Sequence, residues 1–220
     1  MGQRRNLING ALLVLLLSCS LGCGTINSIV LLNLGNWAYD AGQYPEALDR
    51  YQRGLEQAQN SSVKKQKTIG HLLSNLGLVY GRLGQYDRAL EYYQQALDMR
   101  REIKDRTGEV ESLNNLGWVY VDLGKYDRAL EYFQQALAFS REIKDRGGEA
   151  ASLHNLGVAY GNLGQYDRAL DYYQQALAIR REIKKISRNS FLSLNPMTLL
   201  LAVYKKNKDI NIRHRLGKGQ

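Results

Sequence analysis

Cysteine is almost absent from this sequence. Both cysteines, Cys19 and Cys23, fall within the first 23 of 220 residues, so the rest of the chain can hold no disulfide and no cysteine-based zinc site. The three histidines, His71, His154 and His214, are scattered and do not have the spacing of metal ligands. The sequence therefore predicts neither a metal site nor a bound cofactor.

Acidic residues are scarce at both ends of the chain. Residues 1–28 hold two arginines and no acid, and residues 187–220 hold seven basic residues and one acid. Of 30 basic and 21 acidic residues, 21 and 20 therefore remain between these segments. Because the net charge of +9 belongs to the ends, it does not indicate a nucleic-acid-binding domain. The basic tail could touch an anionic membrane or RNA, or could simply aid solubility.

The first 28 residues have the layout of a secretory signal. Two arginines precede a short apolar segment, ALLVLLL, and small residues and cysteine follow it. The segment LLSC (16–19) resembles a bacterial lipobox, and SLGC (20–23) resembles one less well, because Ser20 stands where a large aliphatic residue is usual. Leu17 departs from the pattern in the first copy, where a small residue is commoner.

These features are compatible with four interpretations of residues 1–28. They are a lipoprotein signal with Cys19 or Cys23 as the lipidated residue, an ordinary cleaved signal, an uncleaved anchor over 7–24, and a cytoplasmic chain whose start is misassigned. The apolar segment is short for a transmembrane helix, which needs roughly 20 apolar residues. We expect a protein of the cell envelope, membrane-attached or exported, with lipidation as the favoured route.

One stretch of sequence recurs along the chain. GQYDRALEYYQQAL at 84–97 returns with few changes at 124–137 and 164–177, and a looser copy lies at 42–55. Residues 73–112 and 113–152 share 28 of 40 positions. Repetition at a fixed period is the signature of a stacked-repeat architecture.

Each unit is expected to form two helices, here termed helix A and helix B. Apolar residues at helical spacing predict helix A over 73–83, and Gly84 is expected to end it. Asp87 is the expected cap of helix B, which should continue through MRREIKDR until Gly108 breaks it. The carboxylates of this charged stretch, such as those of Asp105 and Glu109, look solvated.

Small and large residues alternate in a way that suits packed hairpins. Gly77 and Ala89 fall where two helices of a hairpin must approach closely, and Tyr80, Tyr86 and Tyr93 supply the bulky side chains facing them. One hairpin cannot bury its apolar face alone, so successive units are expected to stack and share a core.

The repeated pattern resembles the tetratricopeptide repeat. The residues that carry the resemblance are Leu73, Leu76, Gly77, Tyr80, Gly84, Tyr86, Ala89, Leu90, Tyr93 and Ala96. The unit of 40 residues, in place of the usual 34, is similar to those of Pins/LGN-type scaffolds, kinesin light chains and many bacterial, notably cyanobacterial, arrays. The resemblance implies an all-α, right-handed solenoid of four hairpins over about 29–70, 71–110, 111–150 and 151–186.

Residues 187–220 depart from the repeat. Asn195-Pro196 could begin a last helix over MTLLLAVYKK that closes the apolar end of the stack, and the remainder is a loose basic tail.

A second face of helix A points to a partner. In the family that the repeats resemble, helix A lines a concave groove, and this face changes between units while the core stripe does not. The candidate groove residues are Asn33, Asn75, Arg82, Asn114, Asn115, Trp118, Asp122, His154, Asn155 and Asn162. Trp118 is the expected anchor, and Asn114 and His154 are expected to add specificity.

The asparagines Asn33, Asn75, Asn115 and Asn155 recur once per unit and form a ladder. In proteins that resemble this one, such an asparagine often bonds the backbone of an extended peptide, because an amide both donates and accepts. Alternatively, the ladder could tie neighbouring repeats together.

Three classes of function remain. A non-enzymatic scaffold for a peptide or protein is favoured, because no Ser/His/Asp or Cys/His arrangement and no phosphate-binding glycine loop is present. An architectural protein whose copies assemble into homo-oligomers is the alternative, and an enzyme is the least favoured class.

Overall fold

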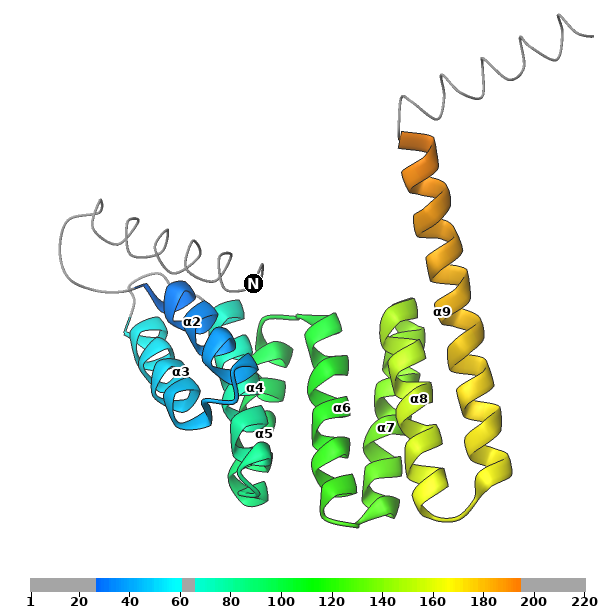
Figure 1. Cartoon of the computed structure of the whole chain (residues 1–220), viewed down its shortest axis with the longest axis horizontal. Helices are drawn as coiled ribbons and strands as arrows, with labels where there is room; N and C mark the ends of the chain where they lie inside the picture. The colour runs from blue at the N-terminus through cyan, green and yellow to red at the C-terminus, as the bar shows by residue number, and fades with distance from the viewer. Residues whose placement is uncertain (1–26, 61–65, 195–220) are drawn as a thin grey trace, which may run out of the picture.

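The computed structural model describes residues 27–60 and 66–194. These residues form eight α-helices and no strand, as the sequence predicts. The helices are α2 (Ser28–Asp40), α3 (Tyr44–Gln59), α4 (Gln66–Arg82), α5 (Tyr86–Glu102), α6 (Arg106–Asp122), α7 (Tyr126–Glu142), α8 (Arg146–Asn162) and α9 (Tyr166–Leu194). Figure 1 shows them as a row of antiparallel hairpins, with each hairpin packed beside the next.

A short turn joins helix A to helix B within each hairpin. Gly84 lies in the turn between α4 and α5 with a φ of 71°, a left-handed conformation that a side chain would strain. Its amide donates to the carbonyl of Gly81, and the amide of Gln85 donates to that of Tyr80. The predicted end of helix A at this glycine is therefore confirmed.

The connection between hairpins differs from the prediction. Helix α5 ends at Glu102, and Gly108 lies inside α6 instead of breaking a helix. The chain turns at Lys104, whose φ is 58°, and the Asp105 carboxylate accepts the Gly108 amide at 3.2 Å as the N-terminal cap of α6. Asp105 is therefore a capping residue and not a solvated charge.

The predicted cap of helix B is also wrong. The residue before α5 is Gln85, whose side chain makes no capping bond, and Asp87 lies within the first turn. There its negative charge faces the positive end of the helix dipole. Glu109 was expected to be solvated but is 7% exposed in α6.

Removing the Asp105 cap should weaken the array measurably. Asp105→Ala leaves the Gly108 amide without its partner, and we expect a loss of about 1 kcal/mol in the free energy of unfolding. Urea denaturation followed by far-UV circular dichroism measures this loss. Asp105→Asn keeps a side-chain oxygen that can cap the helix and is the control, and an equal loss in both variants would contradict the assignment of the cap.

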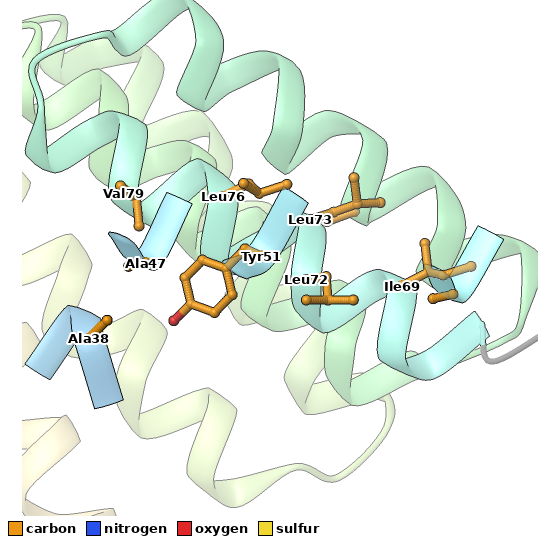
Figure 2. Close-up of a cluster of buried hydrophobic side chains, with 10 residues drawn as sticks. Ala38, Ala47, Tyr51, Ile69, Leu72, Leu73, Leu76 and Val79 are labelled. Carbon is orange, nitrogen blue, oxygen red and sulfur yellow. The ribbon is translucent and has the colours of Figure 1, made fainter. Parts of the chain in front are cut away.

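The core runs continuously from one hairpin to the next. In the first cluster, Tyr51 of α3 packs with Ala38 of α2 and with Leu72 and Leu76 of α4 (Figure 2). The next cluster likewise joins residues of α4, α5, α6 and α7. Neighbouring repeats therefore share their buried surface, as stacked repeats do.

In successive hairpins a glycine of helix A faces an aromatic ring of helix B, and this pairing sets the distance between the two helices. A Cβ atom placed on Gly77 would lie 2.9 Å from the Tyr93 ring, and one on Gly117 would lie 2.4 Å from the Phe133 ring. Glycine at these positions lets the two helices approach, which confirms the packing role predicted for Gly77.

The first and last described helices extend into the two terminal segments, 1–28 and 187–220, that the sequence set apart from the repeats. Asn27 caps α2, so the last residues of the predicted segment 1–28 belong to the first hairpin. Helix α9 continues past residue 186 to Leu194. The predicted capping helix over 197–206 and the basic tail lie outside the described residues, as do Cys19 and Cys23.

Candidate partner-binding groove

A groove of about 580 Å³ opens between α4 and α6, with α5 at its base. Its walls combine apolar, aromatic and charged side chains. The lining residues are Leu78, Gly81 and Arg82 of α4, Tyr86 and Tyr93 of α5, and Asn115, Trp118, Val119 and Asp122 of α6. The groove therefore follows the helix A face on which the sequence placed its candidate residues.

The structure brings four of the predicted residues together at this groove. They are Arg82, Asn115, Trp118 and Asp122. Trp118 and Leu78 occupy equivalent positions in neighbouring repeats, both line the groove, and each is 36% exposed. Large apolar side chains that stay exposed inside a concave site are typical anchors for a partner.

Trp118 is held in place from below. Its ring lies 6.0 Å from the ring of Phe133 in an edge-on arrangement, and Phe133 is fully buried. A braced aromatic side chain loses little conformational freedom when a partner covers it. Trp118 is therefore a preorganised contact surface.

The two walls of the groove carry opposite charges. Arg82 on α4 donates from Nε to the Tyr39 hydroxyl at 2.9 Å, and this hydrogen bond raises the pKa of Arg82. Asp122 occupies the equivalent position on α6. At the base, burial raises the pKa of Tyr93. The groove can therefore meet both a carboxylate and an amine of one ligand.

Five of the nine lining residues, including both tyrosines, were not among the candidates from the sequence. Tyr86 and Tyr93 were assigned to packing alone, yet both line the groove. Tyr93 performs both tasks, because it is 4% exposed and packs against Gly77. The sequence pattern did not indicate that helix B reaches the base of the groove between two successive A helices.

The asparagine ladder does not act as one unit. Asn75 donates to Asn36 Oδ1 at 2.8 Å, and Tyr51 donates to the same oxygen at 2.7 Å. Asn155 is 6% exposed and donates to Asn114 Oδ1 at 2.9 Å. These two members bridge neighbouring A helices, which is the structural alternative that the sequence left open.

Asn33 and Asn115 differ from the other two members. Within residues 27–60 and 66–194, neither side chain makes a hydrogen bond, so both amides remain available. Asn33 is exposed on α2, whereas Asn115 is half-buried and lines the groove. A role of Asn115 in holding a peptide backbone stays a prediction.

Asn114 corrects the prediction of a partner-facing side chain. It is 8% exposed, and its amide donates to the Val110 carbonyl at 3.0 Å and to Ser152 Oγ at 3.1 Å. With Asn155 donating to its oxygen, the whole amide is engaged between α6 and α8. Asn114 therefore ties two repeats together.

His154 and Asn162 lie on α8, away from the residues that line the groove. His154 packs beside Tyr173, with ring centroids 5.3 Å apart, and burial together with nearby Arg180 lowers its pKa. Asn162 is exposed and donates to the Val158 carbonyl within its own helix at 3.1 Å. A role for either in binding is untested.

The comparison with protein families identifies the repeat. Residues 26–102, 68–142 and 123–182 match the model of the tetratricopeptide repeat, and together these spans cover well over half of the chain. The chain therefore belongs to the tetratricopeptide repeat family, and its array of hairpins is the fold of that family. A search of curated proteins gave no match.

Several solved structures share the fold. BtubC (BKLC) from P. vanneervenii is 26% identical with a TM-score of 0.61, and the match covers 70% of this chain and 64% of BtubC. A putative kinesin light chain from Podospora anserina is 19% identical with a TM-score of 0.63, over 83% of this chain and 92% of that one. The Rap conjugation gene regulator of plasmid pLS20, solved with the Phr* peptide, is 19% identical with a TM-score of 0.62, over 69% and 42%. The chain thus spans less than two thirds of BtubC and of the Rap regulator.

None of the described helices is both long enough and apolar enough to cross a membrane.

Proposed function

We propose that this protein is a non-enzymatic scaffold that holds an extended peptide segment of a partner protein in the groove between α4 and α6. The observation that carries the proposal is the exposed pair Trp118 and Leu78, which lines one concave site together with the charged residues Arg82 and Asp122. The Rap regulator, which shares the fold, was solved with a bound peptide, and this supports the same class of ligand.

The groove chemistry defines the kind of segment that would fit. An apolar or aromatic side chain would pack on Trp118 and Leu78, and the Asn115 amide would bond a peptide group of the same segment. Opposite charges on the two walls would fix its direction, with acidic residues toward Arg82 and basic residues toward Asp122.

Trp118→Ala tests this proposal most directly. Peptides are selected from a random twelve-residue library on the full chain, and their dissociation constants are measured by fluorescence anisotropy. Loss of the anchor should weaken the selected peptides at least tenfold, because central aromatic anchors contribute about 2 kcal/mol or more. Gln134→Ala, an exposed position on α7 outside the groove, is the control. Equal affinity of wild type and Trp118→Ala for every selected peptide would contradict the proposal.

A comparison of two ladder asparagines separates binding from stability. Asn115→Ala should lower peptide affinity several-fold, as expected for a lost hydrogen bond of about 1 kcal/mol, and leave unfolding nearly unchanged. Asn155→Ala should instead lower the free energy of unfolding, because it leaves the Asn114 amide oxygen unpaired. A loss of stability in Asn115→Ala together with a loss of peptide affinity in Asn155→Ala would contradict these two assignments.

We also propose that residues 1–28 tether the array to the cell envelope through a lipid on Cys19 or Cys23. The support is the order of charge, apolar segment and cysteine in this segment. Intact mass of the native protein from membranes should show a chain that begins at one of these cysteines and carries acyl mass. A chain that begins at Met1 or Gly2 without acyl mass would contradict it.

A further inference from the structure

The last helix of the array leaves an apolar stripe uncovered. The stripe consists of Tyr166, Leu170, Tyr173 and Leu177 on the outer side of α9, and these residues are 74%, 55%, 36% and 47% exposed. Figure 1 shows α9 as the last helix of the row among the described residues. Terminal repeats of such arrays normally carry a polar outer face, so this stripe needs an explanation.

The equivalent positions are covered more fully in the preceding repeats, where those of Tyr166 and Leu170 are half-buried and those of Tyr173 and Leu177 are buried. Tyr93 and Phe133, the equivalents of Tyr173, are 4% and 0% exposed, because helix A of the following repeat covers them. Leu97, the equivalent of Leu177, is 2% exposed. The stripe of α9 therefore has the composition of a repeat interface whose second side is not among the described residues.

A further repeat does not begin at the usual place. Asp105 and Asp145 cap the helices that follow α5 and α7, but Lys185 stands at the equivalent position and lies inside α9. A lysine cannot accept the free amides of a new helix, and α9 instead continues to Leu194. Leu194 is about 25 Å beyond Leu177 along the helix axis.

The spacing of the stripe fits a second α-helix. Its residues follow one another at intervals of four, three and four, which is the spacing of a coiled-coil seam. Asp167, Gln174 and Arg181 lie beside the seam at intervals of seven. If a second copy of α9 packs antiparallel with Gln174 near the two-fold axis, Asp167 of each copy lies opposite Arg181 of the other.

Both of these charges are free to pair in this way. Arg141, the equivalent of Arg181, bonds Glu149 of the following repeat at 2.9 Å. No repeat follows Arg181 among the described residues, and neither it nor Asp167 forms an ion pair within them. The same packing places the long stems of Arg180 and Lys184 over Leu170 and Tyr166 of the second copy, where they can cover apolar surface.

We propose that the outer face of α9 is a homodimer interface in which two copies of α9 pack antiparallel along this stripe. The proposal is independent of the function of the groove, and it gives each dimer two grooves. A closed two-fold pair buries both stripes at once, because the same surface is used on each copy.

Sedimentation velocity of the full chain over a concentration series tests the proposal. The wild type should dimerise, and Leu170→Glu with Leu177→Glu should be monomeric with unchanged helicity, since both leucines are exposed. A wild-type chain that remains monomeric, as it would if its own C-terminal residues covered the stripe, would overturn the proposal. Dimerisation that persists in the double glutamate variant would overturn it as well.

Charge exchange tests the antiparallel register without altering the apolar stripe. Asp167→Arg and Arg181→Asp should each weaken dimerisation at least tenfold, because each places like charges together at two sites. The variant with both changes should recover to within about threefold of wild type, and failure to recover would overturn the arrangement.

A disulfide trap adds a direct distance test. Gln174→Cys should form a disulfide between the two copies at residue 174, identified by peptide mapping, and Gln134→Cys at the matched position of α7 should not. Equal crosslinking at both positions would overturn the assignment of the interface to α9.

Discussion

Gly117→Ala is expected to lower the free energy of unfolding by about 2 kcal/mol, although alanine normally favours a helix over glycine. The added Cβ would lie 2.4 Å from Cε1 and 2.7 Å from Cδ1 of Phe133. Phe133 is 0% exposed, so its ring has no solvent-filled space into which to move. Helices α6 and α7 would have to separate, and the shared core on both sides of the hairpin would loosen.

Gly81→Ala provides the matched control for this effect. Gly81 also lies in a helix A, but the nearest heavy atom to its added Cβ is the Ala89 Cβ at 4.0 Å. We expect this variant to be unchanged or more stable by about 0.5–1 kcal/mol, the ordinary helical gain. Urea denaturation monitored by circular dichroism measures both variants. Equal stability of Gly117→Ala and Gly81→Ala would contradict the packing account.

Arg100→Ala is expected to lower the free energy of unfolding by about 3 kcal/mol. Arg100 is 2% exposed at the joint between α5 and α6, where it donates to the Gly108 carbonyl and Ser112 Oγ, both at 2.8 Å. It also bonds Glu111 at 3.0 Å. Burial lowers the pKa of Arg100, while the carboxylate of Glu111 opposes this shift. Alanine would leave a cavity and remove the partner of a buried hydroxyl.

Arg101→Ala is the control for the buried arginine. The Arg101 side chain is 52% exposed and lies 4.0 Å from its nearest carboxylates. Its loss should change stability by less than about 0.5 kcal/mol, as is usual for exposed ion pairs. The two unfolding midpoints in urea are compared directly. A loss at Arg100 no larger than that at Arg101 would show that the buried hydrogen bonds do not hold this joint.

The joint at Arg100 also shows why the sequence pattern predicted the hairpins better than the connections between them. Gly77, Tyr93 and Gly84 recur at fixed spacing, and each has one physical role that the spacing defines. The position of Arg100 holds Ser140 in the next repeat, where the hydroxyl bonds the Leu137 carbonyl. Because the joint is held by a buried arginine in one repeat and by a serine in the next, these two repeats share no residue at this position that a sequence pattern could show.

The errors at Asp87 and Gly108 have a related origin. An aspartate before a helix and a glycine after a charged stretch are common boundary signals, but each also suits another position. Gly108 is needed because a Cβ there would lie 2.5 Å from Asp105 Oδ2 and 2.8 Å from Arg100 Cδ. Such a tertiary contact cannot be inferred from the local sequence.

The candidate groove was predicted in part for a similar reason. Trp118, Asp122 and Arg82 were correctly placed on one face, because helical spacing alone decides which side chains lie together. Asn114 and Asn115 are neighbours in sequence but differ in environment, since successive helical residues are about 100° apart. Asn114 turns toward α8 and is buried, whereas Asn115 reaches the groove.

The central claim is that the concave face between α4 and α6 is the recognition surface. The chain has only two tryptophans, Trp118 in the groove and Trp37 in the first hairpin, so their indole N–H resonances report on two separate places. The most direct measurement is a ¹⁵N correlation spectrum of the full chain during titration with a selected peptide. The account predicts a shift of the Trp118 indole signal at the concentrations at which anisotropy shows binding, with the Trp37 signal unmoved. A bound peptide that leaves the Trp118 signal unchanged would contradict it.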